Sequence, residues 1–178
     1  MRQIRSLISS LIGFVGLYGC AVKPAPSAYL DYQTKTILTL PLSGEALIGT
    51  GGRTLELNPD HIVVRDQRFA LDIVALAPGS LPPEHDGLVA RALSGEIREL
   101  YEGNNYYDNK NHYCFGRQIV APGAGVVTDT KDGVKENQVG ERNTKEIPGN
   151  YVVIDHLNGE YSMLAHFLNG SVSVKNGD

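Results

Sequence analysis

Residues 149–166 read GNYVVIDHLNGEYSMLAH, with two β-rich runs on either side of the turn sequence LNGE at residues 157–160. Asn-Gly between such runs is a strong hairpin signal, because both residues tolerate the positive φ that a tight turn between twisted strands requires. The valines, isoleucine and tyrosines of the two runs favour extended backbone. The segment therefore predicts a β-hairpin, with His156 and His166 near the ends of its strands.

Short β-rich runs of this kind recur along the chain between turn signals. They occur at residues 36–42, 46–48, 54–57, 61–64, 69–74, 118–120, 126–128, 151–154, 161–166 and 171–174. Residues 88–100 (LVARALSGEIREL) have a helical spacing of leucine and isoleucine, interrupted by Gly95, and predict one or two short helices in an insertion. We therefore predict an all-β or β-dominated fold.

The composition fits one globular domain and argues against nucleic acid as a partner. A hydrophobic fraction of 42% is too high for a disordered chain, and 178 residues suit a single core. Acidic residues outnumber basic ones by 20 to 16, and no cluster of Lys and Arg occurs. Because nucleic-acid binding needs a basic face that collects phosphates, we expect no nucleic-acid partner.

The N-terminus has the pattern of an export signal. Arg2 and Arg5 precede an apolar stretch at residues 6–19, which is shorter than the ~20 residues of a membrane-spanning helix. The sequence LYGC at residues 17–20 resembles a bacterial lipobox, in which the cysteine is lipidated. We expect a signal peptide over residues 1–19, a lipidated Cys20 with a proline-rich tether over residues 20–28, and a domain over residues 29–178. Because Tyr18 stands where that motif has a small residue, plain cleavage and an uncleaved anchor are the alternatives.

The sequence contains few of the motifs that indicate a kind of catalysis. There is no Gly-x-Ser-x-Gly elbow and no phosphate-binding glycine loop before a helix, which leaves metal-assisted chemistry. A hairpin over residues 61–74 would place His61 beside Asp72, giving a nitrogen and an oxygen ligand suited to zinc. An ordinary surface hydrogen bond between these two side chains is the alternative. If Cys20 carries lipid, Cys114 has no disulfide partner, and we expect it to be a buried, unreactive thiol in a strand over residues 113–120.

Short motifs at several positions along the chain, taken together with their order and spacing, resemble those of one protein family. They are GNYVVI at residues 149–154 followed by His156, NGEY at 158–161, LAHF at 164–167, APGAGVV at 121–127, GSV at 170–172 with Val174 and Gly177-Asp178, LPL-x-G at 40–44, Gly51-Gly52, Asn58, His61 and QRFALD at 67–72. Together they resemble the lysostaphin-type (LytM-like) zinc metallopeptidases, the segments before residue 73 resembling one exported branch of that family. The resemblance covers most of residues 39–178.

The resemblance implies a compact antiparallel β-sheet or sandwich with a groove that holds one Zn²⁺. The activity it implies is the hydrolysis of peptide cross-links in bacterial peptidoglycan. Most of the family takes its first two ligands from a His-x-x-x-Asp motif. Asp72 matches the Asp, but Arg68 occupies the His position, and a guanidinium cannot ligate zinc. His61 is the expected substitute. The third ligand belongs to a later His-x-His motif that the sequence stops short of, so we expect the natural chain to continue past Asp178, with a natural short form as the alternative.

His166 matches the family position whose imidazole activates the attacking water or stabilises the transition state. A strand-end hydrogen-bond donor is the other interpretation of this histidine. The sequence thus predicts an exported, lipid-anchored zinc endopeptidase of the cell envelope that acts on peptidoglycan or its stem peptides. A non-catalytic LytM-like module that binds peptidoglycan or activates another hydrolase is the alternative, and a purely structural envelope lipoprotein is more remote.

Overall fold

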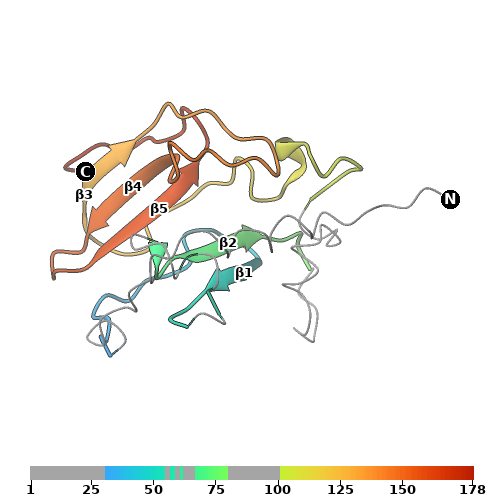
Figure 1. The fold of residues 1–178 in the computed structure, drawn as a ribbon. Coiled ribbons are helices and arrows are strands. Elements are labelled where there is room, and N and C mark those ends of the chain that lie inside the picture. Colours follow the sequence, from blue (N-terminus) through green and yellow to red (C-terminus); the bar gives the residue numbers. More distant parts are fainter. Residues whose placement is uncertain (1–30, 55–56, 59–60, 62–66, 80–100) are drawn as a thin grey trace, which may run out of the picture. The chain divides into compact units, whose positions relative to one another are not determined.

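The computed structural model describes residues 31–54, 57–58, 61, 67–79 and 101–178. Every strand pairing in this part of the chain is antiparallel, and its helical residues are a few in 3-10 conformation, which confirms the predicted all-β class (Figure 1). The elements are β1 (Ala46–Gly51), β2 (Leu71–Ala75), the 3-10 turn η5 (Asn109–Asn111), β3 (Val126–Lys131), β4 (Asn150–Asp155) and β5 (Tyr161–Phe167).

Strands β1 and β2 form the first sheet. Their register runs from Ala46 opposite Ala75 to Gly51 opposite Leu71, with an irregularity between Ile48 and Thr50. Gly51 has no room for a side chain, because a Cβ there would collide with the side chain of Leu71. The strand ends in buried Ala75, and the next residue, Leu76, is the centre of a small apolar cluster formed with Leu47, Val74 and Tyr101.

Strands β3, β4 and β5 form the second sheet, with β4 in the middle (Figure 1). Side chains alternate between the faces of a strand, and in β4 this alternation buries Val152 and Ile154 on the same face as Val127 of β3. Phe167 and Val172 pack against that buried face. The sheet therefore has a core face and a more open face.

The predicted hairpin is confirmed as β4 and β5. Ile154 lies opposite Ser162, and the His156 N–H donates to the Glu160 carbonyl across the turn. Glu160 also reaches beyond the hairpin, because its carboxylate accepts the backbone N–H groups of Lys35 and Thr36 at 2.8 and 2.6 Å. The hairpin tip therefore holds the segment that precedes β1.

Three predicted strands are wrong, and hydrogen bonding explains each of them. At residues 36–42 and 118–120 the backbone–backbone hydrogen bonds are single ones, from the Thr39 N–H to the Pro122 carbonyl and from the Val120 N–H to the Pro41 carbonyl, both 2.8 Å. Because proline has no N–H, neither partner can return a bond and no ladder extends. At residues 171–174 the Val172 N–H donates to the Asp132 carboxylate, a side-chain acceptor that competes with strand pairing.

Some predictions concern residues outside the described ranges. These are the signal peptide with the lipidated cysteine at residues 1–28, the pairing strand at residues 62–64, part of the strand at 54–57 and the helical segment at 88–100. The chain divides after Tyr32, and the unit Gln33–Asp178 contains both sheets.

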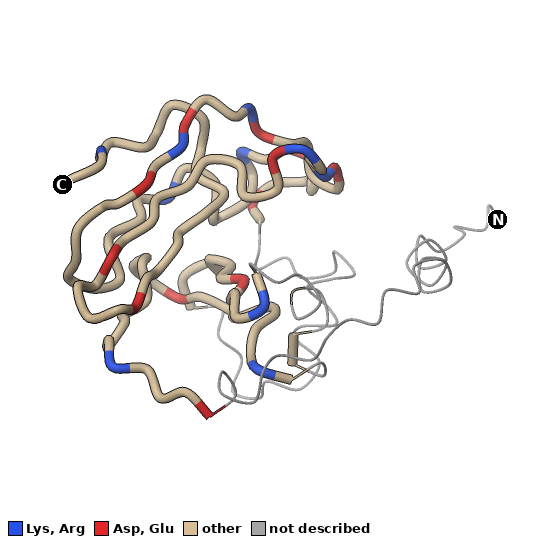
Figure 2. The backbone as a smooth tube through the Cα atoms, turned by 60° about the vertical axis from the view of Figure 1, so that its left-hand side comes forward, with Lys and Arg blue, Asp and Glu red and all other residues tan. Residues whose placement is uncertain are grey.

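In the ranges that the structure describes, no helix has the length and apolar character needed to cross a membrane. Lys and Arg alternate with Asp and Glu along the described backbone and do not gather on one segment (Figure 2).

Candidate metal and proton-transfer site

His61 and Asp72 come together although eleven positions separate them in sequence. Asp72 is the second residue of β2, opposite Thr50, and His61 belongs to a turn. The His61 Nε2 and Asp72 Oδ1 atoms lie 3.6 Å apart, which is too long for a hydrogen bond. Two ligands bound ~2.0–2.1 Å from a tetrahedral zinc are about 3.3 Å apart. The spacing therefore fits two ligands of one metal ion better than the predicted alternative of a surface hydrogen bond.

The side chains of His61 and Asp72 differ in burial. The side chain of His61 is 15% exposed, whereas that of Asp72 is 50% exposed. The Nδ1 atom of His61 is buried and has no hydrogen-bond partner in the described part of the molecule. When an imidazole ligates through Nε2, its proton is on Nδ1, so this buried atom is the N–H donor of a ligating His61. These two residues fit zinc as part of a ligand set.

A complete ligand set is not present in the part of the chain that the structure describes. Within those ranges, no group of three or more His, Cys, Asp or Glu residues gathers as a metal site would require. Hydrolytic zinc sites usually have three protein ligands and one open position. Among the described residues, His61 and Asp72 are therefore two ligands of an incomplete set.

Asp72 and His166 line the same groove, which has a volume of about 710 Å³. Residues 71–74 of β2 and residues 163–168 at the end of β5 border it, together with the loop that follows η5. Leu71 and Met163 give the groove exposed apolar surface, and Arg117 and Glu136 add one charge of each sign. The groove therefore has a mixed lining of apolar side chains and charges of both signs.

His166 occupies a β-bulge at the end of β5. Tyr151 pairs with Ala165 and Asn150 pairs with Phe167, so His166 is the extra residue between two successive pairs. Its φ is 65°, in the left-handed region that residues other than glycine rarely adopt, and its N–H donates to the Pro148 carbonyl at 3.1 Å. Bulges next to active sites re-aim a side chain, and strained backbone tends to occur at functional positions.

The imidazole of His166 is available for proton transfer. The residue is exposed, and neither ring nitrogen has a hydrogen-bond partner among the described residues. Its Nδ1 lies near Gly149, where a Cβ would approach to 3.9 Å. The predicted alternative, a strand-end histidine that donates a hydrogen bond, does not match this side chain. His166 also borders a second hollow of about 220 Å³, so it stands where two recesses meet.

His156 has a different environment from His166. Its Nδ1 lies 2.7 Å from the Ala124 carbonyl and its Nε2 lies 3.0 Å from Ser162 Oγ. Because the carbonyl can only accept, Nδ1 carries the proton and Nε2 accepts from the hydroxyl. Both nitrogens are therefore in use, which supports the interpretation that His156 orients its neighbours and does not bind metal.

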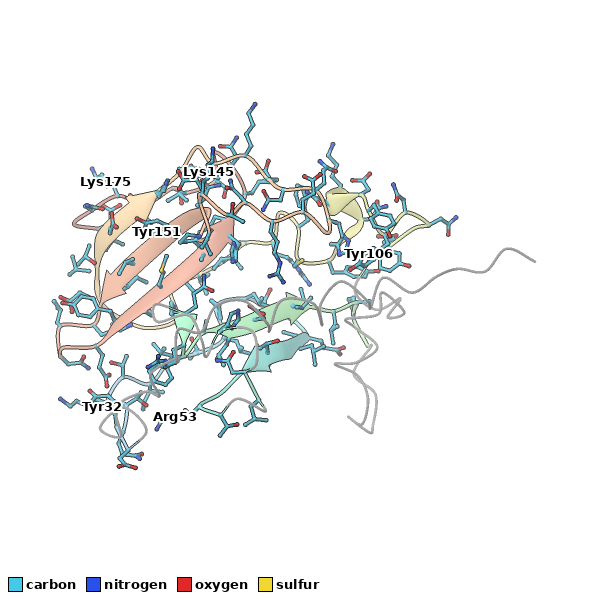
Figure 3. The ribbon with its side chains drawn as sticks, viewed as in Figure 1. Tyr32, Arg53, Tyr106, Lys145, Tyr151 and Lys175 are labelled. Atoms are coloured by element: carbon cyan, nitrogen blue, oxygen red, sulfur yellow. The ribbon has the colours of Figure 1, made fainter. Side chains whose placement is uncertain are left out.

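Tyr151 points from β4 on the more open face of the second sheet, where it is labelled in Figure 3. Its hydroxyl donates to Asp129 Oδ2 at 2.9 Å, and this hydrogen bond is the main reason why the pKa of Tyr151 is raised. Tyr151 therefore stays protonated at neutral pH, and its hydroxyl proton is donated to the Asp129 carboxylate.

The loop around η5 contributes groove residues that the sequence did not reveal. His112 borders the groove, and its Nε2 lies 2.7 Å from the Tyr106 carbonyl, with Tyr101 and Tyr106 packed around its ring (Figure 3). Arg117 also lines the groove and donates from Nε to the Tyr113 carbonyl at 3.1 Å. Nothing in the spacing of these residues relates them to β2 or β5, so no motif could have identified them.

The expectation for Cys114 is wrong in two respects. The residue lies in consecutive turns, closed by bonds from Phe115 N–H to the His112 carbonyl and from Arg117 N–H to the Cys114 carbonyl, and Gly116 has φ 68°. It is an exposed residue, so it is not a buried strand position. Desolvation of the thiol by surrounding atoms nevertheless raises its pKa, which favours the thiol over the thiolate at neutral pH.

The predicted site residues thus have three outcomes. His61 and Asp72 are adjacent, and His166 shares a groove with Asp72. Cys20 lies outside the described residues.

Comparison of the chain with models of protein families, with curated protein sequences and with solved structures gave no match. The site's geometry and the sequence motifs therefore carry the functional inference.

Proposed function

We propose that this protein is a zinc metalloendopeptidase that hydrolyses peptide cross-links of bacterial peptidoglycan. The observation that carries the proposal is the 3.6 Å spacing of His61 Nε2 and Asp72 Oδ1, together with a groove that Asp72 and His166 both line. The resemblance of residues 39–178 to lysostaphin-type peptidases supplies the substrate class. A groove bordered by two sheet edges gives an extended peptide room on both sides of the reacting bond.

His61 and Asp72 would hold the ion, and His166 would handle the proton. Zinc supplies Lewis acidity, which polarises a peptide carbonyl and lowers the pKa of water towards ~7. His166 has a free ring nitrogen to take a proton from the attacking water and return it to the leaving amine. Because of the bulge, His166 is the extra residue between two pairs of the ladder, and it borders the groove.

The protein is further proposed to act at the cell envelope as a lipoprotein anchored through Cys20. The charged start, the apolar stretch and LYGC at residues 17–20 support this location. Replacing the thiol by Cys20→Ala should move the protein from the membrane fraction to the soluble fraction. The intact mass of the membrane form should exceed that of the unmodified mature chain by a lipid group. If the native protein and Cys20→Ala were distributed equally between the membrane and soluble fractions, the anchor would be refuted.

A non-catalytic LytM-like module that binds peptidoglycan or activates another hydrolase is the second candidate. Two observations favour it: Arg68 stands in the family's histidine position, and the described residues supply only two clustered ligands. Such a module would bind cross-linked muropeptides without cleaving them, so product analysis separates the two candidates.

The zinc proposal is tested by removing each ligand in the full-length protein. His61→Ala and Asp72→Ala should each lower bound zinc, measured by elemental analysis after dialysis, and abolish muropeptide cleavage. Asp129→Ala is the matched control, because it removes a carboxylate from the open face of β3 and should leave zinc content unchanged. Full zinc content in both ligand variants would refute the assignment.

A further inference from the structure

Asn58 is completely buried and lies in the loop that carries His61. Its side-chain Nδ2 donates to the Gly52 carbonyl at 3.1 Å and to the Arg68 carbonyl at 2.9 Å. Both partners can only accept, so the orientation of the amide is fixed, with Nδ2 towards the carbonyls and Oδ1 on the other side.

These two bonds join the ends of the loop between β1 and β2. Gly52 immediately follows β1, and Arg68 precedes Asp72 by four positions. The backbone N–H of Asn58 adds a bond to the Thr54 carbonyl at 3.0 Å. One buried side chain therefore closes the segment from which His61 reaches Asp72, and any movement of this closure would change the spacing of the two ligands.

Two buried atoms in this loop have no hydrogen-bond partner in the described part of the chain: Asn58 Oδ1 and His61 Nδ1. Buried polar atoms are rarely left unpaired, and each such atom calls for a physical explanation. The two are complementary, because an amide oxygen is an acceptor and Nδ1 is the donor of an imidazole that ligates through Nε2. They are also only three positions apart in sequence.

We propose that Asn58 is a positioning residue for His61 in the zinc site, an inference that rests on the proposed metal-binding function. Its Nδ2 holds the loop closed through the Gly52 and Arg68 carbonyls. Its Oδ1 and the His61 Nδ1 are not bonded to each other in this structure, and the bond between them would form when ligation through Nε2 fixes the proton on Nδ1. Histidine ligands almost always donate their second ring nitrogen to such an acceptor, which sets the tautomer and the ring orientation.

The test compares Asn58→Ala with Asn150→Ala in the full-length protein. Asn150 is an equally buried asparagine whose Nδ2 donates to the Val134 and Phe167 carbonyls, with its Oδ1 satisfied by the Val134 N–H. Zinc affinity is measured by competition with a chromogenic chelator. Asn58→Ala should lower zinc affinity by about 10–100-fold, the usual effect of losing such a partner, and Asn150→Ala should leave it unchanged. Equal affinity of Asn58→Ala and the native protein would overturn the proposal.

A measurement on the native sequence covers the case in which Asn58→Ala does not fold. Nitrogen NMR of the histidine rings in the zinc-loaded protein should show His61 with a protonated, hydrogen-bonded Nδ1 and a metal-shifted Nε2. Ligation through Nδ1, or a solvent-exchanging Nδ1 proton, would contradict the role of Asn58.

The outcomes also separate this proposal from the peptidase assignment. A native protein that binds zinc in an Asn58-dependent way but cleaves nothing supports the positioning role and refutes the peptidase. If the native protein cleaves muropeptides while Asn58→Ala keeps full zinc affinity, the peptidase assignment is supported and the positioning role of Asn58 is refuted. A native protein that binds no zinc overturns both.

Discussion

His166 combines an exposed imidazole with a backbone conformation that costs free energy. A left-handed φ is unfavourable by roughly 1–2 kcal/mol for a residue with a Cβ, and glycine avoids this cost. With φ at 65°, His166→Gly should therefore be more stable than His166→Ala by about 1 kcal/mol, as measured by chemical denaturation. Both variants should lose cleavage and retain zinc. Equal stabilities would mean that the bulge relaxes, and retained cleavage would remove His166 from the mechanism.

The sequence predicts individual site residues where a motif or a local pairing relates them. His61 was expected beside Asp72 through a hairpin over residues 61–74, and the two atoms are 3.6 Å apart. The described pairing of Asp72 is with Thr50 of β1, however, and His61 lies in a turn, so the structure shows the proximity without the predicted strand at residue 61. By contrast, His112 and Arg117 reach the groove through a loop whose path depends on ring packing and single backbone bonds. Such contacts leave no periodic pattern in a sequence, which is why these residues were not predicted.

The hairpin formed by β4 and β5 contains a second strained residue, and this one has no place in the proposed chemistry. Leu157 has φ 59° at the turn and is 73% exposed, so its side chain contributes little burial. Leu157→Gly should raise the free energy of unfolding by about 1 kcal/mol, because the left-handed conformation then carries no Cβ penalty. Muropeptide cleavage should not change. A loss of stability on denaturation would show that Leu157 makes contacts that offset its strain.

Asp132 joins the end of β3 to the segment after β5 by hydrogen bonds, and its contribution to the stability of the fold depends on pH. Its carboxylate accepts N–H bonds from Gly170 at 2.8 Å, Gly133 at 2.7 Å and Val172 at 3.2 Å, and these bonds, the one from Gly170 most of all, lower its pKa. A carboxyl group with a lowered folded pKa stabilises the fold above its unfolded pKa, and this contribution disappears as the pH falls through the folded value.

The stability difference between the native protein and Asp132→Asn should therefore be constant above about pH 5 and shrink below about pH 4, since an unperturbed Asp titrates near 3.9. Denaturation curves collected from pH 3 to pH 7, roughly the range over which Asp titrates, provide the measurement. A difference that grows on acidification would contradict the role of the charged carboxylate.

At the level of elements, the sequence is most informative where alternation and turn chemistry agree. The run at residues 149–166 has both, and it forms the hairpin as predicted. The runs at residues 36–42 and 118–120 are apolar but contain or adjoin prolines, and their backbone groups bond singly to Pro122 and Pro41. A β-rich composition shows that a segment is extended, but pairing also needs a donor on both sides.

At the scale of the whole molecule, the proposed site depends on two separate sheets. His61 and Asp72 belong to the β1–β2 part of the chain, and His166 belongs to the β3–β4–β5 sheet, yet Asp72 and His166 line one groove. Sequence spacing could not predict this groove, because the pairing of each sheet is local whereas the groove is formed by segments about ninety residues apart.

Bound zinc should therefore stabilise the folded chain as well as serve catalysis. A ligand at 100 times its dissociation constant that binds only the folded state adds about 2.7 kcal/mol to the free energy of unfolding. Removal of zinc with a chelator should lower the melting temperature of the native protein, and readdition should restore it. An unchanged melting temperature in both steps would argue against a metal ion held by His61.

The most direct test is the incubation of the native full-length protein with purified cross-linked muropeptides, before and after zinc removal. We predict that the zinc-loaded protein converts cross-linked muropeptides to uncross-linked products, that the chelated protein does not, and that added zinc restores the reaction. Binding of the muropeptides without any zinc-dependent cleavage would contradict the peptidase assignment and leave the non-catalytic module as the function.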